Sequence, residues 1–137
     1  MHVIAAVLVA IPVWWGLATG LAPMRARAPV GWQAWMSLVL VRPVLEEVVF
    51  RGLLQGQLLR LGAARRLGPV SLANVLATLA FVAAHAFSQP PAWTLATLAP
   101  SLVFGHLRER FGSVWPAIVV HALYNTGFGF AALLVPK

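Results

Sequence analysis

The chain has no cysteine and very little negative charge. Its 137 residues include three acidic side chains against ten basic ones, and charged residues make up only 9% of the total. The absence of cysteine excludes a disulfide framework, a thiolate nucleophile and a cysteine-ligated metal site. With 61% hydrophobic residues, the composition also excludes an ordinary water-soluble domain, in which roughly 45–50% is usual.

The few charged residues are separated by long apolar runs. About five such runs can be distinguished, near residues 3–21, 32–59, 71–87, 92–107 and 114–135. Ser71 is suited to cap the third run, Ser88–Pro91 marks a break before the fourth, and Arg108–Ser113 indicates a charged turn before the last. Crossing a bilayer as a helix takes roughly 20 mostly apolar residues. We therefore predict an all-α fold, a polytopic transmembrane helix bundle of about five hydrophobic segments. The length leaves room for a single membrane-embedded domain, residues 1–137.

The net charge of +7 raises the possibility of a nucleic-acid partner, but the basic residues are distributed differently. They fall in small groups between the apolar runs, such as Arg25 and Arg27, Arg65 and Arg66, and Arg108 and Arg110. This spacing is typical of loops that contact lipid headgroups. The expected partner is therefore the lipid bilayer and not nucleic acid.

Two of the three acidic residues are adjacent, at Glu46 and Glu47, inside an apolar run. Arg51 follows Glu47 by four residues, so on a helix these two side chains share a face and can pair. Glu46 lies about 100° away around the helix axis. One carboxylate can then serve as a structural ion pair while the other accepts a proton from water. A salt bridge near the membrane surface is the simpler alternative.

Two further polar sets lie inside apolar runs. His85 follows Phe81 by four residues, and His121 is followed by Asn125 at the same spacing. Taken singly, His85 could be a buried histidine bonded to a backbone carbonyl. His121 and Asn125 could likewise be polar residues that join neighbouring helices.

Taken together, the three sets suggest chemistry. Isolated polar groups in a membrane are costly, whereas groups that converge satisfy one another. A glutamate and a histidine holding one water give a general base, and a histidine with an asparagine gives donors for an oxyanion. We expect the motif-bearing helices to converge on an intramembrane site that hydrolyses an amide. None of the serines is placed as a nucleophile; they are Ser37, Ser71, Ser88, Ser101 and Ser113.

The ordered motifs resemble those of a known family. Glu-Glu-x-x-x-Arg at 46–51, Phe-x-x-x-His at 81–85 and His-x-x-x-Asn at 121–125, with Arg110 to Ile118 leading into the last, are similar to the CPBP family. This family comprises CaaX proteases and bacteriocin-processing enzymes and is also called Abi. The similarity covers roughly residues 40–130.

The resemblance implies a glutamic-type intramembrane endopeptidase. By this analogy Glu46 activates water and His85 assists it. Glu47 and Arg51 orient the site, and His121 with Asn125 forms the oxyanion side. No cofactor is expected. Zinc is the alternative, held by Glu46, His85 and His121 in a metalloprotease, although Arg51 beside the acids would repel a dication.

The chain is shorter than better-known members such as the eukaryotic Ras-converting enzyme and corresponds to a core alone. The substrate implied is a protein or peptide with an apolar C-terminal tail, prenylated or not. The reduced size favours self-association into a homo-oligomer, and the resemblance places the chain in a prokaryotic cytoplasmic membrane. The competing interpretations are a non-enzymatic bacteriocin-immunity or scaffold protein and a proton-coupled transporter.

Overall fold

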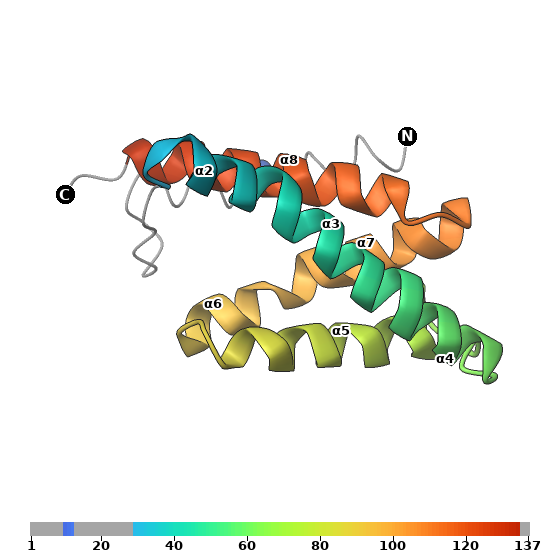
Figure 1. The fold of residues 1–137 in the computed structure, drawn as a ribbon. Helices are drawn as coiled ribbons and strands as arrows, with labels where there is room; N and C mark the ends of the chain where they lie inside the picture. The colour runs from blue at the N-terminus through green and yellow to red at the C-terminus, as the bar shows by residue number, and fades with distance from the viewer. Residues whose placement is uncertain (1–9, 13–28, 135–137) are drawn as a thin grey trace. The chain divides into compact units, whose positions relative to one another are not determined.

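Helices dominate the computed structural model, which describes residues 10–12 and 29–134 (Figure 1). Residues 10–12 are helical. The remaining described elements are the helical segments α2 (Gly31–Met36), η1 (Ser37–Val41), α3 (Arg42–Glu47), η2 (Val48–Gln55), α4 (Gly56–Arg60), α5 (Leu72–Ala86), α6 (Pro91–Ala96), α7 (Leu98–Phe111) and α8 (Trp115–Leu134), and the strands β1 (Arg66–Leu67) and β2 (Val70–Ser71). The all-α expectation is confirmed for this part of the chain, apart from the two-residue strands.

The chain divides into two compact units. Unit 1 comprises Met1–Val44 and Val119–Lys137, and unit 2 comprises Leu45–Ile118. Unit 2 therefore contains the glutamate pair and the Phe-x-x-x-His motif, while unit 1 contains the His-x-x-x-Asn motif.

Helical elements follow one another without a loop from Gly31 to Arg60, and two of them, η1 and η2, are π-helical. In a π-helix each N–H bonds the carbonyl five residues earlier, which widens the turn. Arg42 follows η1 directly and donates its backbone N–H to the carbonyl oxygen of Ser37, and Pro43 is the next residue. Because a proline ring clashes with the carbonyl four residues before it in an α-helix, the widened turn gives Pro43 room.

Unit 2 begins with a helical hairpin. After α4 the chain turns through the antiparallel pair of β1 and β2, in which Arg66 is opposite Ser71, and returns as α5. Ser71 caps α5 by accepting a hydrogen bond from the backbone N–H of Asn74 at 3.0 Å, as the sequence predicts. The hairpin makes η2 and α4 antiparallel to α5.

The second half of unit 2 consists of α6 and α7. The break expected at Ser88–Pro91 is confirmed, since α5 ends at Ala86 and α6 begins at Pro91. A core of apolar side chains lies between α5 and α7, and its buried members are Ala73, Ala77, Phe81, Phe104 and Leu107. The arginines at 108 and 110 do not lie in a loop: α7 continues through them to Phe111 and ends at Gly112, whose φ of +66° suits glycine.

Of the described helices, α8 alone is both long enough and apolar enough to cross a membrane. The five-span bundle is therefore not confirmed. The predicted span at 3–21 lies outside the described residues except for 10–12. The helix α5 has 15 residues and α7 has 14, each shorter than the roughly 20 that a span requires.

Candidate active site

The two adjacent glutamates have different surroundings. Glu47, at the end of α3, is fully buried, and its Oε2 lies 3.3 Å from Nε of Arg51, which is also fully buried. Glu46 is only half-buried. The α-helical offset of adjacent residues, about 100°, turns one carboxylate into the helix packing and leaves the other partly exposed.

Arg51 joins η2 to α7. Its Nη2 donates to both the backbone oxygen of Ser101, at 3.0 Å, and the Oγ of the same residue, at 2.7 Å. The guanidinium carbon also lies 4.8 Å from the ring centre of Phe81 and 5.8 Å from that of Phe104. A guanidinium enclosed by two aromatic faces, a carboxylate and a serine is fixed in position.

A row of polar side chains continues from Ser101 onto α5. The Ser101 hydroxyl donates to Thr78 Oγ1 at 3.0 Å, and that hydroxyl donates to Asn74 Oδ1 at 3.3 Å. Asn74 Nδ2 in turn donates to the backbone oxygen of Leu102 at 3.0 Å. These side chains are almost completely buried, so each bond satisfies a group that would otherwise be costly.

A second polar group lies further along the same helices. Gln55, one turn after Arg51, donates through Nε2 to the backbone oxygen of Gly105 at 3.1 Å and to Glu109 at 2.8 Å. The hydroxyl of Ser71 also donates to Glu109, and Arg66 lies 3.7 Å from this carboxylate. The third acid of the chain thus completes a polar contact among η2, α5 and α7.

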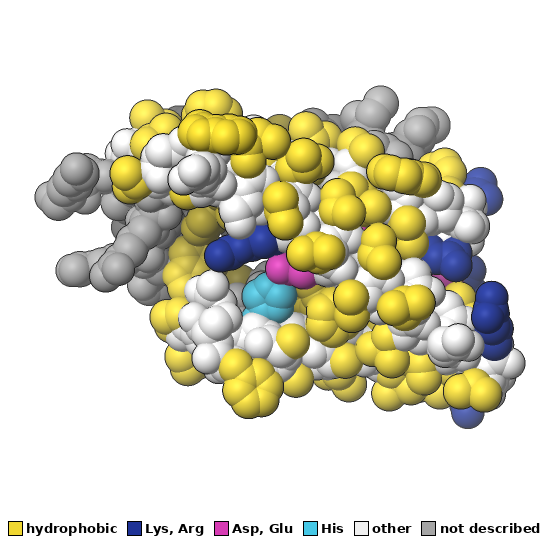
Figure 2. Space-filling view, in the orientation of Figure 1, with side chains coloured by type: hydrophobic (Ala, Val, Ile, Leu, Met, Phe, Trp, Pro, Cys, Tyr) yellow, Lys and Arg dark blue, Asp and Glu magenta, His cyan; other side chains and the backbone are white. Residues whose placement is uncertain are grey.

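His85 is placed near Glu46 by an aromatic contact. The rings of Phe50 and Phe81 meet edge to face, with centres 5.1 Å apart. Glu46 lies one turn before Phe50 and His85 one turn after Phe81, and the two helices are antiparallel. Glu46 and His85 therefore lie on the same side of this contact, toward the same end of unit 2. Both are half-buried, and Figure 2 shows an acidic side chain and a histidine among hydrophobic side chains on this face.

The tautomer of His85 follows from its hydrogen bond. Its Nδ1 lies 2.9 Å from the backbone oxygen of Phe81. A carbonyl oxygen only accepts, so Nδ1 carries the proton, and in the neutral ring Nε2 is then the basic nitrogen. The imidazole also packs against the Phe81 ring, with 4.3 Å between centres. The backbone bond considered as the simpler role of His85 is therefore present, and it leaves Nε2 for chemistry.

His121 and Asn125 lie one turn apart on α8, in unit 1. His121 is buried. Asn125 Nδ2 donates to the backbone oxygen of Leu38 at 2.9 Å. On the same helix, Gly129 lies so close to Trp35 that an added β-carbon would be 2.7 Å from the indole ring. Asn125 therefore joins two helical segments, α8 and η1, as its alternative role predicts.

Unit 2 brings together Glu47 and Arg51, and places Glu46 and His85 on one side of the Phe50–Phe81 contact. Unit 1 holds His121 and Asn125, so the convergence of all six residues remains a prediction. The described residues contain no group of three or more His, Cys, Asp or Glu side chains arranged to share a metal ion.

Comparison with known proteins decides the family. The type II CAAX prenyl endopeptidase Rce1-like family matches residues 27–127 of the chain. The chain belongs to this family. Neither a curated protein nor a solved structure matches it. The matched range contains all three motifs, and it confirms the resemblance inferred from them.

Rce1-like membership indicates a membrane-embedded protease of the CAAX endopeptidase type. The hydrogen bonds of the structure show which polar residues the motifs leave out. Ser101, Thr78 and Asn74 form the row that begins at Arg51, and Gln55 and Glu109 belong to the second polar group. The sequence carries a signal for them in the four-residue spacing of Arg51 and Gln55 and of Asn74 and Thr78. The spacing places each pair on one face of its helix, but it does not show that α7 lies against that face.

Proposed function

We propose that the chain is an intramembrane endopeptidase of the glutamic type that cleaves a peptide bond near an apolar C-terminal tail. The observation that carries the proposal is the different environment of two adjacent acids. Glu47 is buried against Arg51, whereas Glu46 is half-buried. A fully buried carboxylate cannot reach a water molecule, so the half-buried Glu46 is the one suited to act as the base.

His85 supplies the second contact to the attacking water. With Nδ1 donating to Phe81, Nε2 accepts a hydrogen bond from one O–H of a water molecule while the Glu46 carboxylate accepts a hydrogen bond from the other O–H. As the water oxygen bonds to the scissile carbonyl carbon, its proton passes to Glu46. The same proton then moves to the leaving amine nitrogen as the carbon–nitrogen bond breaks, so that the base returns to its starting form.

His121 and Asn125 are assigned to the oxyanion. The amide of Asn125 has two N–H groups, and one of them is used by the carbonyl of Leu38. The second is the donor that we assign to the developing negative charge, together with the His121 ring. A pair of fixed donors stabilises such a transition state strongly, since loss of one costs roughly 100- to 1,000-fold in kcat. This assignment requires the two units to meet at one site.

The test uses the purified full chain in detergent and peptides that end in apolar tails. Wild-type protein is expected to cleave in the presence of a chelator, and Glu46→Gln to lose cleavage by roughly 100-fold or more. Thermal unfolding of Glu46→Gln controls for misfolding. A stoichiometric zinc content together with chelator-sensitive cleavage would instead establish the zinc alternative of Glu46, His85 and His121.

The substrate and the setting are part of the proposal. Family membership supports an apolar tail that enters from the bilayer, and we place the chain in a prokaryotic cytoplasmic membrane. Cleavage of peptides with and without a prenylated cysteine shows whether the substrate tail must be prenylated. Tight binding of every tail without cleavage, unchanged in Glu46→Gln, would favour the immunity or scaffold interpretation.

A further inference from the structure

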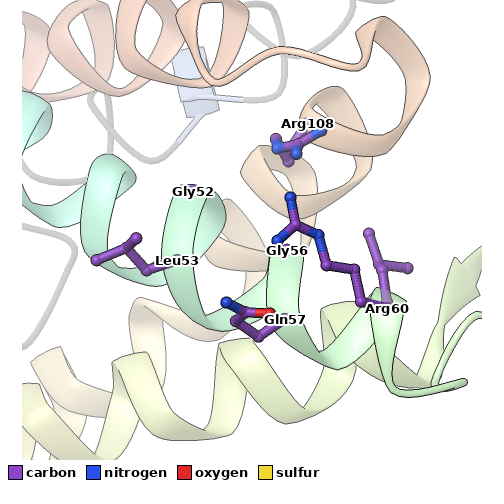
Figure 3. Close-up of a pocket in the computed structure, with 7 residues that line it drawn as sticks. Gly52, Leu53, Gly56, Gln57, Arg60 and Arg108 are labelled. Atoms are coloured by element: carbon purple, nitrogen blue, oxygen red, sulfur yellow. The ribbon is translucent and has the colours of Figure 1, made fainter.

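A pocket of about 340 Å³ lies within unit 2 (Figure 3). Gly52 and Leu53 of η2, Gly56 and Arg60 of α4, and Arg108 of α7 contribute to its lining. In Figure 3 the side chain of Arg60 is turned toward Arg108. Two positive charges from different helices therefore share one pocket.

The pocket lining offers no acid to balance these charges. Among the described residues neither guanidinium has an ion-pair partner, and the buried Nε of Arg108 has no hydrogen-bond partner. Glu109 follows Arg108 in sequence, but its carboxylate is occupied by Gln55 and Ser71. Like charges held together and a buried donor left without an acceptor both favour a bound anion.

The pocket also has an apolar side. Gly56 leaves space in the pocket because it has no side chain. A β-carbon at this position would already lie 4.0 Å from Nη2 of Arg108, so a larger side chain would fill the space beside the guanidinium. Leu53, at the opposite end of the lining, is 61% exposed. The pocket thus offers two guanidinium groups beside exposed hydrocarbon, which matches an amphipathic anion better than a fully hydrated one.

We propose that this pocket binds the phosphate of an anionic phospholipid, with an acyl chain along Leu53. Guanidinium groups match phosphate oxygens in geometry and charge. Basic pockets between membrane helices are typical sites for anionic headgroups, and the family to which the chain belongs is membrane-embedded. The bound lipid would join α4 to α7 next to Arg51. The site does not depend on the proposed hydrolysis.

Native mass spectrometry of the full chain, titrated with phosphatidylglycerol or phosphatidylcholine, tests the proposal. Retention of phosphatidylglycerol is expected to weaken roughly fivefold in Arg60→Gln or Arg108→Gln and roughly 25-fold in the double variant. The matched control is Arg65→Gln/Arg110→Gln, which removes the same charge from exposed positions and is expected to change retention less than twofold.

A second variant, Gly56→Leu, fills the pocket without changing the charge and should also lose the lipid. Equal retention of both lipids, or wild-type retention in the double arginine variant, would overturn the proposal. Displacement of the lipid by inorganic phosphate or by a peptide with a free C-terminal carboxylate would also overturn it, because the pocket would then belong to a soluble anion or to the substrate. Retention against both competitors supports the lipid site.

Discussion

Asn125 completes a hydrogen bond that Pro43 cannot make. Its Nδ2 donates to the backbone oxygen of Leu38 at 2.9 Å. Leu38 lies in the π-helical segment η1, where a carbonyl is expected to bond the N–H five residues later. That residue is Pro43, which has no N–H. The motif asparagine therefore has a structural partner of its own, separate from the oxyanion role proposed for it.

This relationship predicts a coupling between Asn125 and Pro43. Asn125→Ala should lower the free energy of unfolding by about 1 kcal/mol, because it leaves the Leu38 carbonyl without a donor. In a Pro43→Ala background the restored N–H can take over, so the same substitution should cost clearly less. Thermal unfolding of the four proteins of this double-mutant cycle measures the difference.

Thr126→Val is the control for that cycle, since the Thr126 hydroxyl donates to the carbonyl of Ala122 on its own helix. Its cost should be the same in the wild-type and the Pro43→Ala backgrounds. Identical losses for Asn125→Ala in both backgrounds would show that the amide does not replace the missing backbone donor.

Substitutions at the two adjacent glutamates should affect stability differently, although both should abolish cleavage. Glu47→Gln leaves Arg51 buried without its counter-ion and is expected to cost about 3 kcal/mol. Glu46→Gln changes a half-buried side chain and should cost less than about 1 kcal/mol. Thermal unfolding in detergent measures both, and peptide cleavage should be lost in both. A Glu46→Gln protein as unstable as Glu47→Gln would contradict the division of roles.

Ser101 should act as a positioning residue for Arg51. Ser101→Ala removes the acceptor at 2.7 Å from Nη2 and leaves the backbone oxygen as the remaining bond to α7. We expect a loss of about 1–2 kcal/mol in stability and a lower kcat at nearly unchanged KM. Ser101→Thr should retain part of the activity.

Ser88→Ala is the matched control for Ser101, because Ser88 is exposed in the turn after α5. It should leave both unfolding and cleavage unchanged. An equal loss of kcat in Ser88→Ala and Ser101→Ala would contradict the positioning role of Ser101.

Gly105 permits the close approach of α7 to α5. A β-carbon at this position would overlap the side-chain amide of Asn74. Gly105→Ala should therefore destabilise the chain by about 1–3 kcal/mol. By contrast, Gly52→Ala would place its β-carbon 3.6 Å from Val114, an ordinary contact, and should be neutral or slightly stabilising because alanine favours a helix.

Asn74→Ala in the Gly105→Ala background makes space for the new methyl group and should recover part of the loss. Thermal unfolding of the single and double variants provides the measurement. A Gly105→Ala protein as stable as Gly52→Ala would contradict the tight packing of the two helices.

Local signals were sufficient to predict several features of the fold. Ser71 was predicted as a cap and accepts the N–H of Asn74, because capping depends on neighbouring residues alone. The pairing of Glu47 with Arg51 was likewise predicted from a spacing of four. Such features require no knowledge of which helices meet.

Features that depend on helix packing were missed. Ser101 was set aside because nothing in its own segment indicates that it faces Arg51, 50 residues away. The sequence predicts a charged turn at Arg108–Ser113, since charge between apolar runs usually marks a loop, but α7 continues to Phe111 and only the residues from Gly112 on leave the helix. Glu109 is instead stabilised inside the helix by Gln55 and Ser71, which come from two other elements.

The sequence separation of these polar contacts has a consequence for biosynthesis. Arg51 meets Glu47 four residues earlier in the same continuous helical stretch, so this ion pair can form as soon as that stretch is helical. Its contact with Ser101, like that of Gln55 with Gly105, spans 50 residues. At translation rates of about 5–20 residues per second, α7 emerges roughly 3–10 seconds later. During that interval the helical hairpin carries Gln55 without its final partners, and the arrival of α7 completes the fold.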